Sequence, residues 1–189
     1  MQAPPAIQAM IDRLEHEGRL DAVSDAIGDA TKPLTSETAG EVLRGRWLGH
    51  ALHPLLTDFP LGCWLASGLL DLVGGRQARA ASQRLVFLGL VFVPPTALAG
   101  LADYATLRQP STRRVGAVHA IGNTVVAGSY FLSWRSRRAG HHLRGVGLGL
   151  LGGGLAWFTG YLGGHLSFAR GASVEPRGLR EPPEDAPTP

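Results

Sequence analysis

The sequence predicts an all-α integral membrane protein, a four-helix up-down bundle preceded by an amphipathic N-terminal helical segment. Three long segments are almost free of charged residues and a fourth, less regular one is rich in leucine; the four cover 54–73, 85–107, 115–134 and 145–168. Each segment has about the 20 residues that an α-helix needs to cross the hydrocarbon core. Because short loops join consecutive segments, neighbouring helices are expected to run antiparallel.

The composition of the whole chain conceals these spans. A hydrophobic content of 44% and a mean hydropathy of +0.06 are typical of a soluble protein, because the polar residues are concentrated in the two tails. The net charge of +3 comes from arginines in short loops and beside helix ends, a placement that suits the anionic headgroups of a lipid bilayer. No contiguous basic face with interleaved aromatics is evident, so nucleic-acid binding is not expected.

The chain divides into three parts. Residues 1–46 form the amphipathic N-terminal segment, whose apolar residues recur along one helical face: Ile7, Met10, Ile11 and Leu14. We expect this segment to lie on the membrane surface or to cover the bundle. Residues 47–170 form the four-helix transmembrane domain, and residues 171–189 are expected to be a disordered tail. No cleavable signal peptide and no internal repeat are evident.

Two further patterns concern packing and orientation. Small residues recur every fourth position in the last span, at Gly152, Ala156, Gly160 and Gly164, and this spacing predicts that their face packs closely against another helix. The loops on one side of the bundle contain seven arginines, against three in the loop on the other side. This asymmetry predicts that the two arginine-rich loops lie in the cytoplasm and that both termini lie on the same, extracytoplasmic side.

Ionisable residues recur near the ends of the spans on one side of the bundle. They are Asp58, Asp103, His119 and His165, with His53 at the start of the first span. The first four lie roughly 7 to 8 Å inside their helix ends, at about 1.5 Å per residue. Ionisable groups at membrane depth are costly, so a shared layer of them predicts a functional site.

The three histidines predict a cofactor. His53, His119 and His165 could ligate the iron of haem b or a transition-metal ion, because neutral imidazole offers a lone pair. His53 and His119 lie on diagonal helices and are the pair expected to hold a haem between them. Arg113 and Arg114 lie at the same interface and are expected to neutralise its propionates.

Three polar residues could support this centre. Asn123 lies one helical turn after His119 and is expected to orient its imidazole. Asp58 and Asp103 are expected either to fix the other imidazoles or to complete a metal site with the histidines. The alternative is that all these groups are interfacial side chains or buried hydrogen-bond partners without a cofactor. Further along, Asp71 is expected to form a helix-end ion pair with Arg76.

Four stretches of the chain resemble a known family: WLGHALHPLLTDFPLG, AGLADY, RRVGAVHAIGN and GGHLSFARG. Together they are similar to the bacterial four-helix membrane domain of unknown function that also occurs fused to Rieske iron-sulfur domains. Ala51 stands where that family usually has proline, and Tyr104 where tryptophan is common. The resemblance implies a quinone or electron-transfer setting. Because Cys63 is the only cysteine, a Rieske-type or other redox partner is expected to be a separate protein.

Three functions therefore stay open at the level of sequence. The leading hypothesis is a membrane electron-transfer protein with a haem or metal in the histidine layer. The second is a membrane scaffold or anchor that recruits a partner through its N-terminal segment, and the third is a small proton-coupled transporter that uses the histidines and aspartates as a relay. No catalytic residues are identified, and the sequence favours a protein that is not a stand-alone enzyme.

Overall fold

A computed structural model describes residues 4–172, in which every regular element is helical. Three short helices come first: α1 (Pro5–His16), α2 (Asp21–Thr31) and α3 (Glu37–Leu43). Four long helices follow: α4 (Leu52–Val73), α5 (Arg79–Tyr104), α6 (Pro110–Arg138) and α7 (His142–Gly164). A π-helical turn over His165–Ala169 ends the helical region. The predicted tail lies almost wholly outside the described residues.

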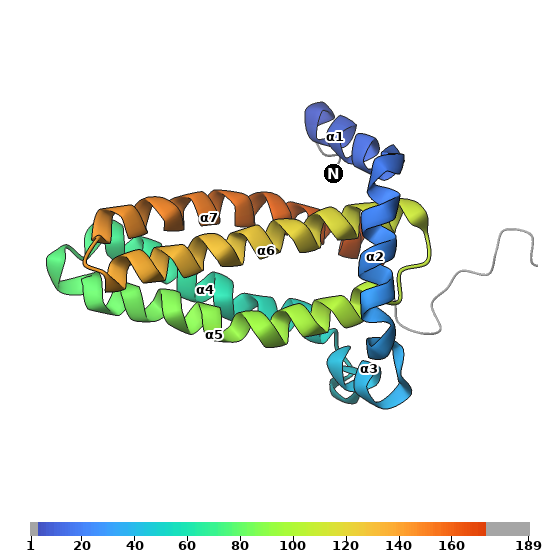
Figure 1. The fold of residues 1–189 in the computed structure, drawn as a ribbon, viewed down its shortest axis with the longest axis horizontal. Helices are drawn as coiled ribbons and strands as arrows, with labels where there is room; N and C mark the ends of the chain where they lie inside the picture. The colour runs from blue at the N-terminus through green and yellow to red at the C-terminus, as the bar shows by residue number, and fades with distance from the viewer. Residues whose placement is uncertain (1–3, 173–189) are drawn as a thin grey trace, which may run out of the picture.

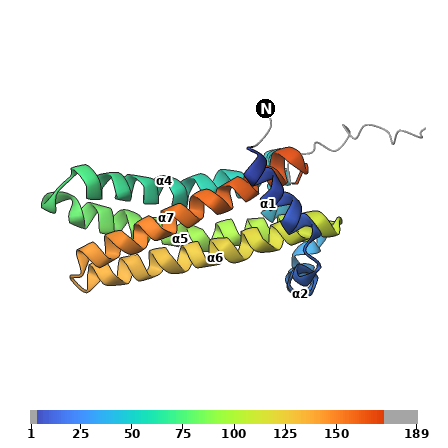
Figure 2. The same ribbon diagram turned by 90° about the horizontal axis from the view of Figure 1, so that it is seen from above.

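The long helices form the predicted up-down bundle, with α4 antiparallel to α5 and α6 antiparallel to α7 (Figures 1 and 2). All four are long and apolar enough to cross a membrane, which confirms the predicted spans. Large apolar side chains cover their outer surface, as contact with lipid requires. They include Leu55, Phe59, Leu65, Leu69, Leu72, Phe87, Val91, Leu98, Val125, Phe131, Leu132, Leu150, Leu151 and Trp157.

At the loop end of the bundle the helices extend beyond the predicted apolar segments, whereas α5 ends at Tyr104, before the predicted end at position 107. Helix α5 begins at Arg79 rather than at position 85, and α6 continues to Arg138 rather than ending at position 134. Arginine side chains reach water from the first and last turns of a span while the backbone stays helical. Helices α5 and α6 are therefore longer than the apolar segments predicted for them.

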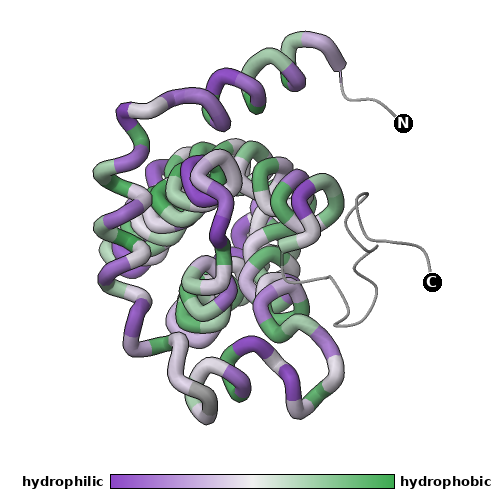
Figure 3. The backbone as a smooth tube through the Cα atoms, turned by 90° about the vertical axis from the view of Figure 1, so that its right-hand side faces the viewer, coloured by the Kyte–Doolittle hydropathy of each residue, from purple (hydrophilic) through white to green (hydrophobic). Residues whose placement is uncertain are grey.

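Helices α1 to α3 form a collar, our name for residues 5–43, around the end of the bundle where α4 and α6 begin. Helix α2 runs across the long helices, and the collar follows the rim of the bundle (Figures 1 and 3). On α1, Ile11 is buried against Val115 of α6, Leu162 of α7 and Leu166 of the π-helical turn. The N-terminal segment covers the end of the bundle, which is one of its two predicted positions.

The α4–α5 and α6–α7 hairpins are built alike, which corrects the expectation that no repeat is present. Three residues on α4 contact three residues on α6 that have the same spacing along the chain: His53 with His119, Trp64 with Tyr130, and Asp71 with Arg137. Contact between equivalent residues is what a two-fold axis produces. Because α4 and α6 both begin at the collar, this approximate axis runs parallel to the helices.

Helices α5 and α7 repeat the same relation to their partners. The carbonyls of Thr96 and Thr159 accept hydrogen bonds from the two histidines, at 2.9 and 2.8 Å. Glycines stand where four rings of the preceding helices approach: Gly89 beside Trp64, Gly152 beside Tyr130, Gly100 beside His53 and Gly163 beside His119. A Cβ atom at any of these positions would come within about 3.0 Å of the ring, so each hairpin packs closely by the same means.

The predicted small-residue face of α7 is only partly right. Gly152 is buried and Ala156 packs against the core, but Gly160 is exposed and a Cβ atom there would meet open space. Positions four apart drift around an α-helix of 3.6 residues per turn, whereas alternating steps of four and three keep to one face. The packed face accordingly consists of Gly145, Gly149, Gly152, Ala156, Thr159 and Gly163.

Candidate functional site

His53 and His119 meet on the two-fold axis near the collar. Their ring centroids are 6.3 Å apart and the ring planes are nearly perpendicular, at 87°. His53 is the second residue of α4, and His119 lies nearly three turns inside α6. Both side chains are partly buried. The structure therefore brings together the two histidines that were expected on diagonal helices.

The hydrogen bonds fix which nitrogen of each ring carries a proton. The Nδ1 atom of His53 bonds the Thr96 carbonyl, and the Nδ1 atom of His119 bonds the Thr159 carbonyl. A carbonyl oxygen only accepts, so both Nδ1 atoms must donate. In the neutral imidazole the other nitrogen then carries a lone pair. Both Nε2 atoms are thus potential ligands, held in a defined orientation.

Asn123 binds His119 as its position one turn later suggests. Its Nδ2 atom donates to His119 Nε2 at 3.0 Å, and the Thr159 hydroxyl donates to its Oδ1 atom at 2.7 Å. Thr159 therefore contacts the imidazole through its carbonyl and the amide through its hydroxyl. The equivalent of Asn123 on α4 is Thr57, whose hydroxyl donates to the His53 carbonyl at 2.8 Å. The support of the two rings is consequently unequal.

His165 is bound to the collar. Its Nε2 atom lies 2.9 Å from Oε1 of Glu15, whose carboxylate also accepts from Arg170. Asp58 is exposed on α4, while Asp103 is buried near the end of α5. Within residues 4–172, no three histidine, cysteine, aspartate or glutamate side chains form a group that could hold a metal ion. The predicted layer of three histidines and two aspartates is therefore reduced to one histidine pair.

Arg113 and Arg114, the predicted propionate partners, also hold the collar. Arg114 binds both carboxylate oxygens of Asp21, at 2.6 and 2.9 Å, and this interaction lowers the pKa of Asp21. Arg113 donates to the Ser24 carbonyl at 3.0 Å and lies 3.1 Å from Asp25. In the sequence, the acidic residues of the N-terminal segment indicate that such contacts could form. Which arginine each acid pairs with depends on the fold and could not be predicted.

A second buried polar layer, absent from the sequence prediction, lies at the opposite end of the bundle. Asp71 pairs with Arg137 through two contacts of 2.7 and 2.9 Å, rather than with Arg76 as expected. The Ser82 hydroxyl donates to Asp71, and His142 lies 3.5 Å from the same carboxylate. Arg137 shares a helical face with His119 and Asn123, and that periodicity could have revealed it.

Comparison with known proteins agrees with this architecture. Residues 49–176 match a family described as "Predicted membrane protein (DUF2231)". The chain belongs to this family. No curated protein and no solved structure matches the chain.

The DUF2231 region contains both polar layers and all four spans. It begins just before α4, so the collar precedes it. The function of DUF2231 proteins is unknown. The membership therefore fixes a membrane protein and leaves the role of the histidine pair to be argued from its geometry.

Proposed function

We propose that the protein is a membrane electron-transfer component in which His53 and His119 together bind a redox-active metal centre. The observation that carries this proposal is the pair itself, two imidazoles from equivalent hairpins with 6.3 Å between their centroids. Metal-binding histidines usually donate their other ring N–H to a carbonyl or carboxylate. Thr96 and Thr159 supply such carbonyls here.

The pair suits a single metal ion better than a haem. The rings rest against Gly100 and Gly163, and Asn123 occupies the Nε2 side of His119. A porphyrin would have to displace Asn123 from His119 and find room for its plane among the helices, whereas an ion replaces one hydrogen bond by a coordinate bond. Arg113 and Arg114 are already engaged with the collar, so haem propionates would compete with Asp21 and Asp25.

Imidazole ligands suit copper, iron, nickel and zinc, and zinc undergoes no redox change. A bound copper or iron ion would supply a one-electron centre. The protein would hold it by the two Nε2 atoms and leave further coordination positions open. Asn123 would orient His119 before the ion binds, and the surrounding apolar helices would restrict water.

The redox partner in this proposal is a separate protein, of the Rieske type or another class. The chain has one cysteine and so cannot itself ligate an iron-sulfur cluster. Because the histidine pair lies at the collar end of the bundle, the partner would approach from that side. A scaffold that recruits a partner through the collar, without a cofactor, is the competing function. The collar residues Glu15, Asp21 and Asp25 already bind the bundle, which leaves them less able to bind a partner.

Metal analysis of purified protein tests the proposal. After reconstitution with copper(I), copper(II) or iron(II), we expect one ion per chain, and His53→Ala and His119→Ala should each lose most of it. His141→Ala, which removes an exposed loop histidine, should keep it. A Soret band that depends on the same two histidines would support the haem version. If neither stoichiometric metal nor such a band appears, the proposal fails and the scaffold is favoured.

We propose that the protein lies in a bacterial plasma membrane, with its α4–α5 and α6–α7 loops on the cytoplasmic side. Arginines at the collar end pair with acids, as in Arg46–Glu41 and Arg170–Glu15, so their charge is largely neutralised. The basic loops at the other end then dominate the charge asymmetry. Labelling of single cysteines at Gly75 or Ala139 in a Cys63→Ser background should fail in intact cells and succeed after lysis. The reverse result would invert the topology.

A further inference from the structure

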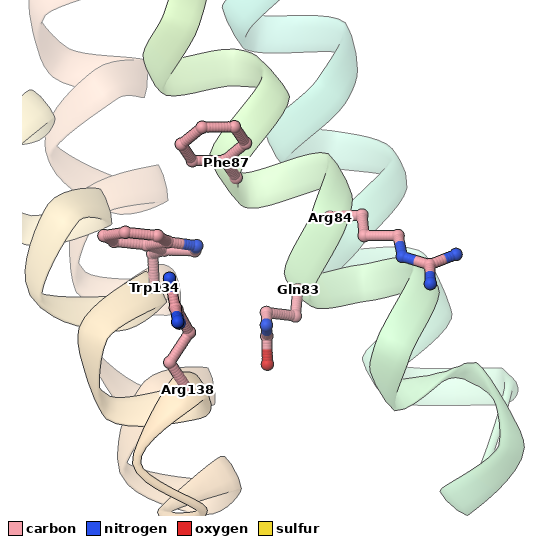
Figure 4. Close-up of a pocket in the computed structure, with 5 residues that line it drawn as sticks. All are labelled: Gln83, Arg84, Phe87, Trp134 and Arg138. Atoms are coloured by element: carbon pink, nitrogen blue, oxygen red, sulfur yellow. The ribbon is translucent and has the colours of Figure 1, made fainter.

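A groove opens between α5 and α6 close to the loop end of the bundle. It has a volume of about 340 Å³ and is lined by Gln83, Arg84, Phe87, Trp134 and Arg138 (Figure 4). This groove lies on the outer surface, far along α6 from His119. Its lining combines polar and aromatic side chains, unlike the aliphatic surface of most of the spans.

The lining residues are sorted by depth. Gln83 lies one turn before Phe87 on α5, and Arg138 lies one turn after Trp134 on α6. On both helices the polar residue is therefore about 6 Å nearer to the loops than the aromatic one. Figure 4 shows Gln83 and Arg138 on the loop side of the two rings. The groove is thus polar towards the membrane surface and apolar towards the membrane core.

The side chains are arranged around Trp134. The Phe87 ring stacks on it with a centroid distance of 5.3 Å, and the Arg138 guanidinium lies 5.2 Å from the tryptophan ring centroid. This cation–π contact holds the guanidinium at the groove while its N–H donors stay available. The Arg84 guanidinium points away from Trp134 in Figure 4, so this lining residue adds positive charge at the edge of the groove rather than beside the ring.

The loop end of the bundle carries an excess of positive charge, which an anion bound there would neutralise. Asp71 is the carboxylate at the loop end of the spans, and it is already paired with Arg137. No ion pair within residues 4–172 involves the remaining arginines at this end: Arg76, Arg79, Arg84, Arg135, Arg138 and Arg144. A cluster of positive charge at a membrane surface attracts anionic lipid headgroups.

The internal repeat provides a comparison within the molecule. The positions on α7 and α4 equivalent to the four groove residues are Val146, Leu150, Gly68 and Leu72. The second copy of this interface therefore has no arginine, amide or aromatic side chain at these positions. The bundle can evidently be built without them, so packing does not explain the polar and aromatic groove.

We propose that this groove is a binding site for an anionic phospholipid. Arg138 and Gln83 donate hydrogen bonds to the phosphate, because both carry N–H groups on the loop side of the groove. Phe87 and Trp134 contact the first part of the acyl chains, one turn deeper. A lipid fits better than a free anion because the groove continues into the apolar surface of α5 and α6.

The test compares lipids on purified full-length protein in mixed micelles. Phosphatidylglycerol should raise the melting temperature and remain bound in native mass spectra, whereas phosphatidylcholine should do so much less. Arg138→Gln combined with Gln83→Leu should weaken phosphatidylglycerol binding roughly fivefold or more, since one arginine near an anionic surface contributes about 1 kcal/mol. Arg138→Lys should restore part of the binding, because it keeps the charge.

Arg144→Gln is the matched control, since it removes an unpaired arginine at the same end but outside the groove. It should leave phosphatidylglycerol binding nearly unchanged. Equal losses in the groove variant and in this control would show diffuse attraction and overturn the site. So would equal binding of both lipids. If inorganic phosphate stabilises the protein as much as phosphatidylglycerol does, the groove is an anion site and the lipid proposal fails.

Discussion

Asp71 and Arg137 show how two charged side chains are accommodated inside the spans. Their side chains are 5% and 2% exposed, and each is the other's equivalent in the internal repeat. The Ser82 hydroxyl donates to Asp71 and accepts from Arg137, both at 2.7 Å, so the pair is embedded in further hydrogen bonds. Removing one member of such a pair leaves the other charge buried without compensation.

We predict that Asp71→Asn destabilises the protein by about 3 to 5 kcal/mol, the usual cost of breaking a buried ion pair from one side. Reversible unfolding in mixed detergent and sodium dodecyl sulfate micelles measures the change. Asp71→Leu with Arg137→Leu should be less damaging than Asp71→Asn, because no charge stays behind. Arg135→Gln, an exposed neighbour, is the control, and equal stability of Asp71→Asn and Arg135→Gln would contradict the prediction.

At the scale of elements, α7 offers a test of which glycines matter. We predict that Gly152→Leu strongly destabilises the bundle, because a Cβ atom at Gly152 already meets Tyr130 at 3.0 Å and Ser129 at 3.2 Å. Gly160→Leu should be tolerated, since nothing lies within 4 Å of a Cβ atom there. Thermal unfolding in detergent compares the two variants, which carry the same substitution in one helix. Comparable losses would refute the assignment of the packed face.

The helices could be predicted from sequence, but their repeat could not. Length and hydropathy define the four spans because lipid contact requires continuous apolar surface. The repeat is defined by the contacts that equivalent side chains make, and not by their residue types. Equivalent positions often differ in type, as Trp64 and Tyr130 or Asp71 and Arg137 do. Apart from His53 and His119, most of the recurring identical residues are small ones such as glycine, serine and threonine, and these are common in membrane helices.

The candidate site, like the fold, could be predicted only in part from the sequence. His53 and His119 could be paired from the expected diagonal placement of their helices, and Asn123 from its helical spacing to His119. The hydrogen bonds to the carbonyls of Thr96 and Thr159 could not be predicted. Every residue has a backbone carbonyl, so the residue type does not show which carbonyl accepts. His165 was assigned to the same layer because the position of the collar, and hence of Glu15, depends on tertiary structure.

At the scale of the whole molecule, the collar is fastened by ionic contacts. Burial disfavours the ionised form of Glu15, but hydrogen bonds and charge from Arg170 and His165 outweigh it, so the pKa of Glu15 is lowered. A lowered carboxyl pKa means that the folded state favours the ionised form. The stabilisation is then present above the unfolded pKa of about 4.3 and is lost as the pH falls through the lowered value.

We therefore predict that acid loosens α1 from the end of α7. Spin labels at Ala9 and Ala169, in a Cys63→Ser background, should give one short distance distribution at neutral pH and a broader one below about pH 4. Glu15→Gln should broaden the distribution already at neutral pH and weaken its acid dependence. Arg19→Gln, which changes an exposed collar residue, is the control. An unchanged distribution in Glu15→Gln would show that apolar contacts alone hold α1.

The opposite charges at equivalent positions of the two hairpins bear on how the chain avoids mispairing. If an α4–α5 hairpin associated with the same hairpin of a second molecule, the two-fold contact would bring two Asp71 carboxylates together inside the membrane. An α6–α7 hairpin associated in the same way would bring two Arg137 guanidinium groups together. Like charges buried in lipid repel strongly and find no counter-ion. Each hairpin is thereby directed to the other half of its own chain, and exchange of hairpins between molecules is disfavoured unless it restores the same unlike pair.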